Sequence, residues 1–270
     1  PNSQSIYTST VQLIASKLEI IEVYNLLSQK NNFIQNKNHH DKFKDFKFLK
    51  MKSVSFKYKK NTEFILDKVN ITINKGEKIA IIGASGSGKS CLLDLMLGFT
   101  KPNLGKIEIN NLELNEFNSH NWYKRISYVP QDVFLMDNSL IENITFKEVS
   151  NLKETQRFMD ILDRASLIEA TKSWQDGLKR VLGERGRYIS GGQKQRIGVA
   201  RALHKESDVI FLDEATSALD EKMEKKIINN LISNYPETTL IAITHRQELL
   251  KNFDKIYKVE NKNLFEITKY

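Results

Sequence analysis

The sequence has 270 residues, of which 40% are hydrophobic and 27% charged, a composition that supports one or two globular domains. The formal net charge is +8, but the lysines mostly alternate with acidic residues, and the lack of a long basic stripe argues against a nucleic-acid partner. The one cysteine excludes an intrachain disulfide, and no stretch reaches the ~18 apolar residues of a membrane-spanning helix.

The N-terminal segment predicts one helix over residues 1–30, because apolar residues recur every three or four positions from Ile6 to Leu26. It has no basic start followed by an apolar run, so we expect no signal peptide, and it lacks an initiator Met, so we expect a piece of a longer chain. Residues 29–45 are polar and predict a linker. His39 and His40 have no nearby third ligand and are interpreted as solvated residues rather than a metal site.

Strand and helix patterns alternate after this linker. Alternating residues over 47–58 and two runs within 65–83 predict three strands, and "SCLLDLMLG" predicts a buried helix that ends at Gly98. "GKIEIN" predicts a further strand, residues 150–206 are mostly helical by pattern, and "DVIFLDEAT" and "TTLIAITH" predict two buried strands. This order predicts an α/β fold with a parallel sheet that helices cover on both sides.

The segment "GASGSGKS" fits the pattern Gly, four residues, Gly, Lys, Ser, and it lies between an apolar strand and a helix. Its glycines let the backbone surround phosphate oxygens, while the amides and the dipole of the helix start favour negative charge. Lys89 can reach the outer phosphates, and Ser90 can bind Mg²⁺. A plain strand-to-helix turn is the alternative. The predicted nucleotide-binding residues here are Gly83, Ala84, Ser85, Gly86, Ser87, Gly88, Lys89, Ser90 and Cys91.

Polar residues follow the two later strands. In "VIFLDEATSALD", Asp213 can complete the magnesium shell with Ser90, and Glu214 can act near the attacking water as general base or orienting group. Two acids after an apolar run could also be a solvated loop, but the phosphate loop favours the magnesium–nucleotide interpretation. His245, in "AITHR", could contact the terminal phosphate or hold the water, although a lone histidine after a strand is often structural. Lys89, Glu214 and His245 are the candidate catalytic residues.

A second glycine pair opens a helix in "ISGGQKQR" and predicts another anion site. With the three motifs above, it resembles the nucleotide-binding domain of ABC transporters from about residue 46 to residue 259. The family signature usually reads Leu-Ser-Gly-Gly-Gln, and Ile189 replaces the leucine here. The resemblance implies a head-to-tail dimer in which each ATP lies between the phosphate loop of one copy and the signature of the other. The residues acting on the partner's ATP would be Ser190, Gly191, Gly192 and Gln193.

The resemblance also implies a domain organisation. We expect a P-loop NTPase (RecA-like) core with a mostly parallel sheet, an antiparallel β subdomain and an inserted helical subdomain at about residues 132–205. Residues 46–270 would form the ATPase domain. Residues 1–45 resemble the cytosolic end of an exporter's last membrane helix with its linker.

Further residues match family positions one by one. Tyr58 matches the aromatic that stacks on adenine, although an aromatic near a strand end is more often core. Gln131 matches the glutamine that touches Mg²⁺ and couples to the membrane domain, and Asp220 belongs to the loop "SALD" that joins the two sites. Glu184, in "GERG", matches an exporter loop that contacts membrane helices. Cys91 stands where the family usually has a hydroxyl, and since a thiol is a weaker donor, we expect slightly weakened ATP binding.

These matches imply a Mg²⁺-dependent ATPase that powers export or flipping at the cytoplasmic face of a bacterial inner membrane. Its partners would be a transmembrane domain and a second copy or a paralogous half-transporter, and the cargo is open among lipid-linked oligosaccharide, lipid, peptide and drug. A kinase or GTPase would leave "ISGGQ" unused, and no Asn-Lys-x-Asp motif is present. A relative acting on DNA or ribosomes would usually carry coiled-coil insertions or a second ATPase domain. An importer subunit would lack "GERG" and the N-terminal helix.

Overall fold

The computed structural model describes residues 2–28, 45–59, 62–115, 118–147 and 152–267. The chain divides into two units, residues 1–40 and residues 41–270. In the first unit, helix α1 (Asn2–Ser28) confirms the helix predicted there. The predicted linker histidines fall outside the described residues. Among the helices described, none is both long enough and apolar enough to cross a bilayer.

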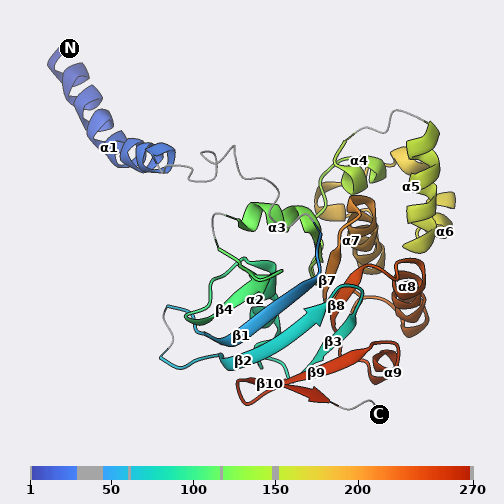
Figure 1. Ribbon diagram of the computed structural model, residues 1–270. Helices are drawn as coiled ribbons and strands as arrows, with labels where there is room; N and C mark the ends of the chain where they lie inside the picture. Colours follow the sequence, from blue (N-terminus) through green and yellow to red (C-terminus); the bar gives the residue numbers. More distant parts are fainter. Residues whose placement is uncertain (1, 29–44, 60–61, 116–117, 148–151, 268–270) are drawn as a thin grey trace. The chain divides into compact units, whose positions relative to one another are not determined.

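The second unit is built on a six-stranded sheet with the order β10-β9-β3-β8-β7-β6 (Figure 1). The pairs β9–β3, β3–β8, β8–β7 and β7–β6 are parallel, whereas β10 is antiparallel to β9. The predicted parallel sheet is therefore confirmed, and it places the ends of β3, β7 and β8 next to one another. The strands are β3 (Lys78–Ile82), β6 (Ile126–Val129), β7 (Val209–Asp213), β8 (Thr239–Ile243), β9 (Lys255–Glu260) and β10 (Asn263–Ile267).

A four-stranded antiparallel sheet with the order β2-β1-β4-β5 lies beside the larger one and confirms the predicted β subdomain. Glu108 of this sheet is 4% exposed and bonds Lys106 at 2.7 Å and Lys52 at 2.6 Å. Hydrogen bonds from Lys106 and then Lys52 hold the pKa of Glu108 below its ordinary value. The strands are β1 (Phe48–Phe56), β2 (Leu66–Asn74), β4 (Leu104–Ile109) and β5 (Leu112–Glu113).

Helices α4, α5 and α6 gather at one end of this unit, and α7 packs against α4, α5 and β6 (Figure 1). The stretch 150–206 is mostly helical, as predicted, and residues 173–190 between α6 and α7 contain two short 3₁₀ turns, η1 (Gly177–Lys179) and η2 (Glu184–Gly186). The α-helices are α2 (Lys89–Leu97), α3 (Ser119–Arg125), α4 (Leu140–Thr145), α5 (Leu152–Arg164), α6 (Ile168–Lys172), α7 (Gly191–Lys205), α8 (Glu221–Asn234) and α9 (Gln247–Leu250).

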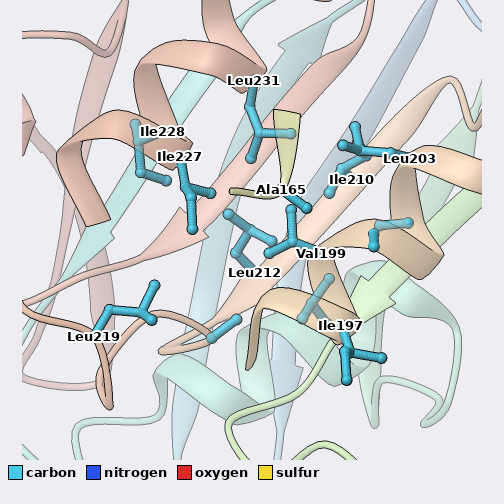
Figure 2. Close-up of a cluster of buried hydrophobic side chains, with 14 of the residues drawn as sticks. Ala165, Ile197, Val199, Leu203, Ile210, Leu212, Leu219, Ile227, Ile228 and Leu231 are labelled. Carbon is cyan, nitrogen blue, oxygen red and sulfur yellow. The ribbon is translucent and has the colours of Figure 1, made fainter. Parts of the chain in front are cut away.

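Two apolar clusters cover the two faces of the parallel sheet. On β7, Val209 and Phe211 join the cluster shared with α2 and the antiparallel sheet, whereas Ile210 and Leu212 join the cluster shared with α5, α7 and α8. The same alternation holds on β3 and β8, as the two-residue period of a strand requires. Figure 2 shows the second cluster, in which side chains from α7, α8 and β7 meet. The sheet is therefore buried on both faces, as predicted.

Close packing holds α7 to the sheet at Gly198. A Cβ atom on this residue would lie 2.8 Å from Val129 Cγ1 and 2.8 Å from Val133 Cγ2. Only a glycine lets the helix approach the end of β6 and the following loop this closely. The helix that begins with the signature is thus fixed against the loop that contains Gln131.

Candidate nucleotide site

The predicted phosphate loop connects β3 to α2 at the carboxyl end of the parallel strands. Gly86 and Gly88 have φ values of 77° and 104°, in the left-handed region that favours glycine. Gly88 is the residue before α2, and no side chain of the described part of the chain caps this helix start. Backbone N–H groups at the first turn therefore remain for an anion, and the helix dipole adds to their attraction.

Lys89 and Ser87 show how the loop is held. Lys89 is 6% exposed, and its Nζ donates to the carbonyl oxygens of Gly83 and Ala84, each at 2.9 Å. Ser87 Oγ is buried and finds no hydrogen-bond partner among the residues that the structure describes. A Cβ on Gly83 would lie 2.7 Å from this hydroxyl and 2.6 Å from the carbonyl oxygen of Val259. The loop thus has the backbone cradle, the cation and the unsatisfied hydroxyl of a phosphate site.

Asp213 ends β7, the second strand along the sheet from β3. Its Oδ2 accepts a hydrogen bond of 3.2 Å from the Tyr128 hydroxyl. Burial is the largest cause that raises the pKa of Asp213 above its ordinary value; the negative charge of Glu214 adds to it, while the Tyr128 bond and Lys89 oppose it. Burial also raises the pKa of Asp94 on α2, with Asp213 as the second cause. A bound cation would relieve the cost of ionising the half-buried Asp213 carboxylate.

Glu214 and His245 follow neighbouring strands, and the structure brings them together. His245 Nε2 lies 2.8 Å from Glu214 Oε1. The side chain of Glu214 is 26% exposed and that of His245 is 52% exposed, so both remain accessible to water. Glu214 has a φ of 47°, a left-handed conformation that is uncommon for a residue other than glycine. The strained backbone and the imidazole together orient this carboxylate at the edge of the sheet.

The signature residues form the start of α7. Ser190 Oγ accepts a hydrogen bond from Gln193 N at 3.2 Å, and Gln193 Oε1 accepts from Ser190 N at 2.9 Å, which together form a capping box. A Cβ on Gly192 would lie 3.1 Å from Leu219 Cδ2. Among the described residues, no hydrogen bond or ion pair joins this segment to the phosphate loop of the same chain. Glu184 lies in η2, close in sequence to this cap.

The remaining predicted positions lie on exposed loops. The Tyr58 hydroxyl lies 3.4 Å from Cys91 Sγ, and this hydrogen bond is the first cause that raises the pKa of Tyr58 to about 12. Tyr58 is 47% exposed and its ring meets that of Phe56 edge-on at 5.1 Å. Gln131 is exposed in the loop after β6. Asp220 caps α8 by accepting from Met223 N at 2.9 Å.

Two residues that the sequence analysis did not single out hold the loop after Glu214. Gln195 is 4% exposed and bonds Ser217 and the backbone of residue 218. Arg246 pairs with the buried Glu224 at 2.6 Å and donates to the carbonyl oxygen of Leu219 at 2.8 Å. Their partners are far away in sequence, so no spacing pattern could identify these two residues. The only available signal was their position beside "SGGQ" and "ITH".

The donor set fits ATP and Mg²⁺. The hydroxyl of Ser90 and the carboxylate of Asp213 are hard oxygen ligands, which suit Mg²⁺ better than softer metals. Within the described residues, no group of three or more His, Cys, Asp or Glu side chains could hold a metal by itself. In proteins, Mg²⁺ is usually bound by one or two protein oxygens together with substrate phosphates.

Comparison with known proteins shows to which family the chain that carries this site belongs. Residues 66–217 match the family model described as ABC transporter. The chain is 36% identical to the mitochondrial iron-sulfur clusters transporter ATM1 of Candida glabrata over 78% of this chain and 29% of the relative. It is 34% identical to the ATP-dependent lipid A-core flippase of Pseudoalteromonas translucida over 81% of this chain and 38% of the relative.

One relative and one solved structure extend over nearly the whole chain. The heterocyst differentiation ATP-binding protein HepA of a Nostoc species is 32% identical over 100% of this chain and 44% of its own length. A bacterial Atm1-family ABC exporter, solved with ATP bound, superposes with a TM-score of 0.83 at 25% identity, over 97% of this chain and 45% of that one. The chain thus spans less than half the length of these relatives.

Proposed function

Because the chain belongs to the ABC transporter family, we propose that it is the ATP-hydrolysing domain of an exporter or flippase. The observation that carries this proposal is the 2.8 Å contact between Glu214 and His245 at the sheet edge that also holds the phosphate loop. A carboxylate, an imidazole and a phosphate cradle on one edge are the parts that hydrolysis of a phosphoanhydride needs. A kinase or GTPase would leave the "ISGGQ" motif at the start of α7 unused, and the relatives with transport names favour export over action on DNA or ribosomes.

Binding of ATP begins at the phosphate loop. The backbone amides at the start of α2 would bind the inner phosphates, and Lys89 would exchange its two loop carbonyls for phosphate oxygens. Ser90 and Asp213 would hold Mg²⁺, with Gln131 as a further ligand when its loop approaches. Mg²⁺, when bound, neutralises charge on the outer phosphates. Tyr58 would stack on the adenine ring beside Cys91.

Hydrolysis takes place where Glu214 and His245 meet. The Glu214 carboxylate accepts a proton from the attacking water as general base, or orients that water toward the terminal phosphate. His245 keeps the carboxylate in place through the 2.8 Å contact and reaches the terminal phosphate from the other strand. Lys89 stabilises the charge that moves onto the leaving phosphate oxygens.

A second copy completes the site. Ser190, Gly191, Gly192 and Gln193 would bind the terminal phosphate of the partner's ATP at the start of α7, and this assignment is supported by the lack, among the described residues, of any bond from this segment to its own phosphate loop. Asp220 would join the two sites across the interface. The second copy is identical or a paralogous half-transporter.

The membrane domain would couple to exposed loops. Gln131 and Glu184 would transmit closure and reopening of the dimer to membrane helices, at the cytoplasmic face of a bacterial inner membrane. The names of the relatives support this, since they include a mitochondrial transporter and a bacterial flippase. Residues 1–45 would connect to the last membrane helix, and the match of the relative HepA over the whole chain supports this assignment.

The substitution Glu214→Gln tests the proposal. It removes the base but keeps the size and polarity of the side chain, so the variant should bind ATP with Mg²⁺ and accumulate as a dimer. The rate of phosphate release should fall by about 10²–10⁴-fold, the usual contribution of a positioned base. The measurements are phosphate release, fluorescence of a bound ATP analogue and size-exclusion chromatography with ATP.

The control is Glu221→Gln, a carboxylate in the first turn of α8 on an exposed position. This variant should hydrolyse ATP as the wild type does. A Glu214→Gln protein that hydrolyses ATP at the wild-type rate overturns the assigned base, and a wild-type chain that binds no ATP overturns the proposed function as a whole.

A further inference from the structure

The Gln195 side chain connects three segments that meet near the catalytic edge. It lies one turn after the signature on α7 and is 4% exposed. Ala218 N donates to Gln195 Oε1 at 2.8 Å, and Gln195 Nε2 donates to Ser217 Oγ at 3.1 Å. The same Nε2 lies 3.5 Å from the carbonyl oxygen of Gln131. One amide thus joins the signature helix, the loop after Glu214 and the loop after β6.

The orientation of this amide follows from its partners. The backbone N–H of Ala218 can only donate, so the atom facing it must be the carbonyl oxygen of the Gln195 amide. The NH₂ group then faces two acceptors, the Ser217 hydroxyl and the Gln131 carbonyl. No hydrophobic or charged side chain of similar size supplies one acceptor and two donors in this arrangement.

The loop held by Gln195 is anchored from its other side as well. Arg246, the residue after His245, donates to the carbonyl oxygen of Leu219 at 2.8 Å and pairs with Glu224 at 2.6 Å. Glu224 also accepts from the Thr216 hydroxyl at 2.6 Å. The Leu219 side chain joins the apolar cluster that contains Ile197 of α7 (Figure 2). Residues 217–219 are therefore fixed both to α7 and to the end of β8.

We propose that Gln195 is a positioning residue that makes the signature helix and the loop 217–219 of one copy move as a unit with Gln131. It touches neither ATP nor the reacting atoms in the proposed function, on which this inference rests. Its effect is transmitted through the backbone of residue 218 and the loop after β6. When nucleotide displaces Gln131, the start of α7 is displaced with it, so occupancy of one site is communicated to the signature that serves the other.

Gln195→Met and Gln195→Glu test this role. Methionine fills a similar volume but makes no hydrogen bonds. Glutamate can still accept from Ala218 N and from the Ser217 hydroxyl, but it has no N–H group to donate to the Gln131 carbonyl oxygen. We expect kcat to fall about 10-fold or more in Gln195→Met while KM for ATP stays near the wild-type value, because a misplaced catalytic group lowers the rate without loss of binding. Gln195→Glu should retain an intermediate kcat.

The matched control is Asn230→Leu. Asn230 is a partly buried amide that donates to the carbonyl oxygen of Arg164 at 3.0 Å, away from the site. Its variant should lose stability in urea to a similar extent and keep kcat. Ser217→Ala completes a double-mutant cycle, in which the loss in the double variant with Gln195→Met should be smaller than the product of the single losses. Equal falls of kcat in Gln195→Met and Asn230→Leu, or purely multiplicative losses, would overturn the proposal.

Hydrogen exchange gives a readout that does not depend on turnover. In the wild type, addition of ATP and Mg²⁺ should slow exchange in the peptides 187–195 and 214–220 together. In Gln195→Met, exchange in 214–220 should be faster without nucleotide, and the two peptides should no longer respond together. Unchanged exchange in the variant refutes the inference even if hydrolysis is absent, whereas a wild type that binds but does not hydrolyse ATP refutes only the catalytic part of the proposed function.

Discussion

Helices α4 and α7 both begin with a capping box, but only the box of α7 belongs to the signature. Ser190 Oγ accepts from Gln193 N at 3.2 Å, and Ser139 Oγ accepts from Glu142 N at 3.2 Å. The return bonds are also alike, 2.9 Å from Ser190 N and 3.0 Å from Ser139 N. Ser139 Oγ also donates to Glu142 Oε2 at 2.6 Å, so Ser139→Ala removes the same cap acceptor as Ser190→Ala and one further hydrogen bond.

The structural cost of each change is small. Alanine removes the acceptor of one backbone amide and costs about 1 kcal/mol, against a total stability of about 5–15 kcal/mol for a typical domain. Both variants should therefore fold. Only Ser190→Ala would also remove a hydrogen bond to the partner's terminal phosphate. A donor lost from a charged transition state costs about 3 kcal/mol, which lowers kcat about 100-fold.

The assay compares urea unfolding with hydrolysis of Mg²⁺–ATP. Ser139→Ala should lower the unfolding midpoint at least as much as Ser190→Ala does, because it loses one more hydrogen bond. In contrast, kcat should fall about 100-fold in Ser190→Ala alone. The reasoning is refuted if the two variants lose hydrolysis equally, since the signature serine would then act only as a cap. It is also refuted if Ser190→Ala retains the wild-type kcat.

Two further predictions concern stability. In Gly198→Ala the new methyl group would meet Val129 and Val133 at 2.8 Å, an overpacking that costs about 1–3 kcal/mol. The gain of about 1 kcal/mol in helix propensity offsets part of this cost, so the unfolding free energy should fall by up to about 2 kcal/mol. A more stable variant in urea would contradict the close packing. The free energy of unfolding of Glu108→Gln should fall furthest below that of the wild type near neutral pH. The lowered pKa of Glu108 means that its contribution is present above the ordinary carboxyl pKa and is lost as pH falls through the lowered value. Unfolding curves at decreasing pH should therefore converge, and a constant difference would show that the two lysines do not stabilise the carboxylate.

The main elements of the fold followed from local patterns in the sequence. The apolar runs predicted β3, β7 and β8, because strands that are buried on both faces consist of such runs. Gly98 predicted the end of α2, because a glycine easily adopts the left-handed conformation that it has there. The strand order could not be predicted, since it depends on pairing between strands more than 100 residues apart. The prediction that residues 150–206 are mostly helical is confirmed by α5, α6 and α7, but the irregular segment between α6 and α7, which contains the fully buried Leu182, had no pattern of its own.

The site was predicted in part. Motif spacing indicated the phosphate loop, Asp213 and Glu214, and the neighbouring positions of β7 and β8 explain why His245 reaches Glu214. Their functional roles stay predictions that the variants above address. Gln195 escaped the sequence analysis because a glutamine in a polar helix has no pattern of its own, and its role is visible only once the loops fold against it.

The bonds from Lys89 to its own loop have a kinetic consequence. Because Nζ holds the carbonyl oxygens of Gly83 and Ala84, the loop has its shape before nucleotide arrives. Arrival of ATP then exchanges one set of partners for another and requires no ordering of the chain, so the association rate should be set by diffusion and by electrostatic attraction to the site. Removal of the lysine would lower that rate in two ways at once, since the site would lose both its positive charge and its preformed shape.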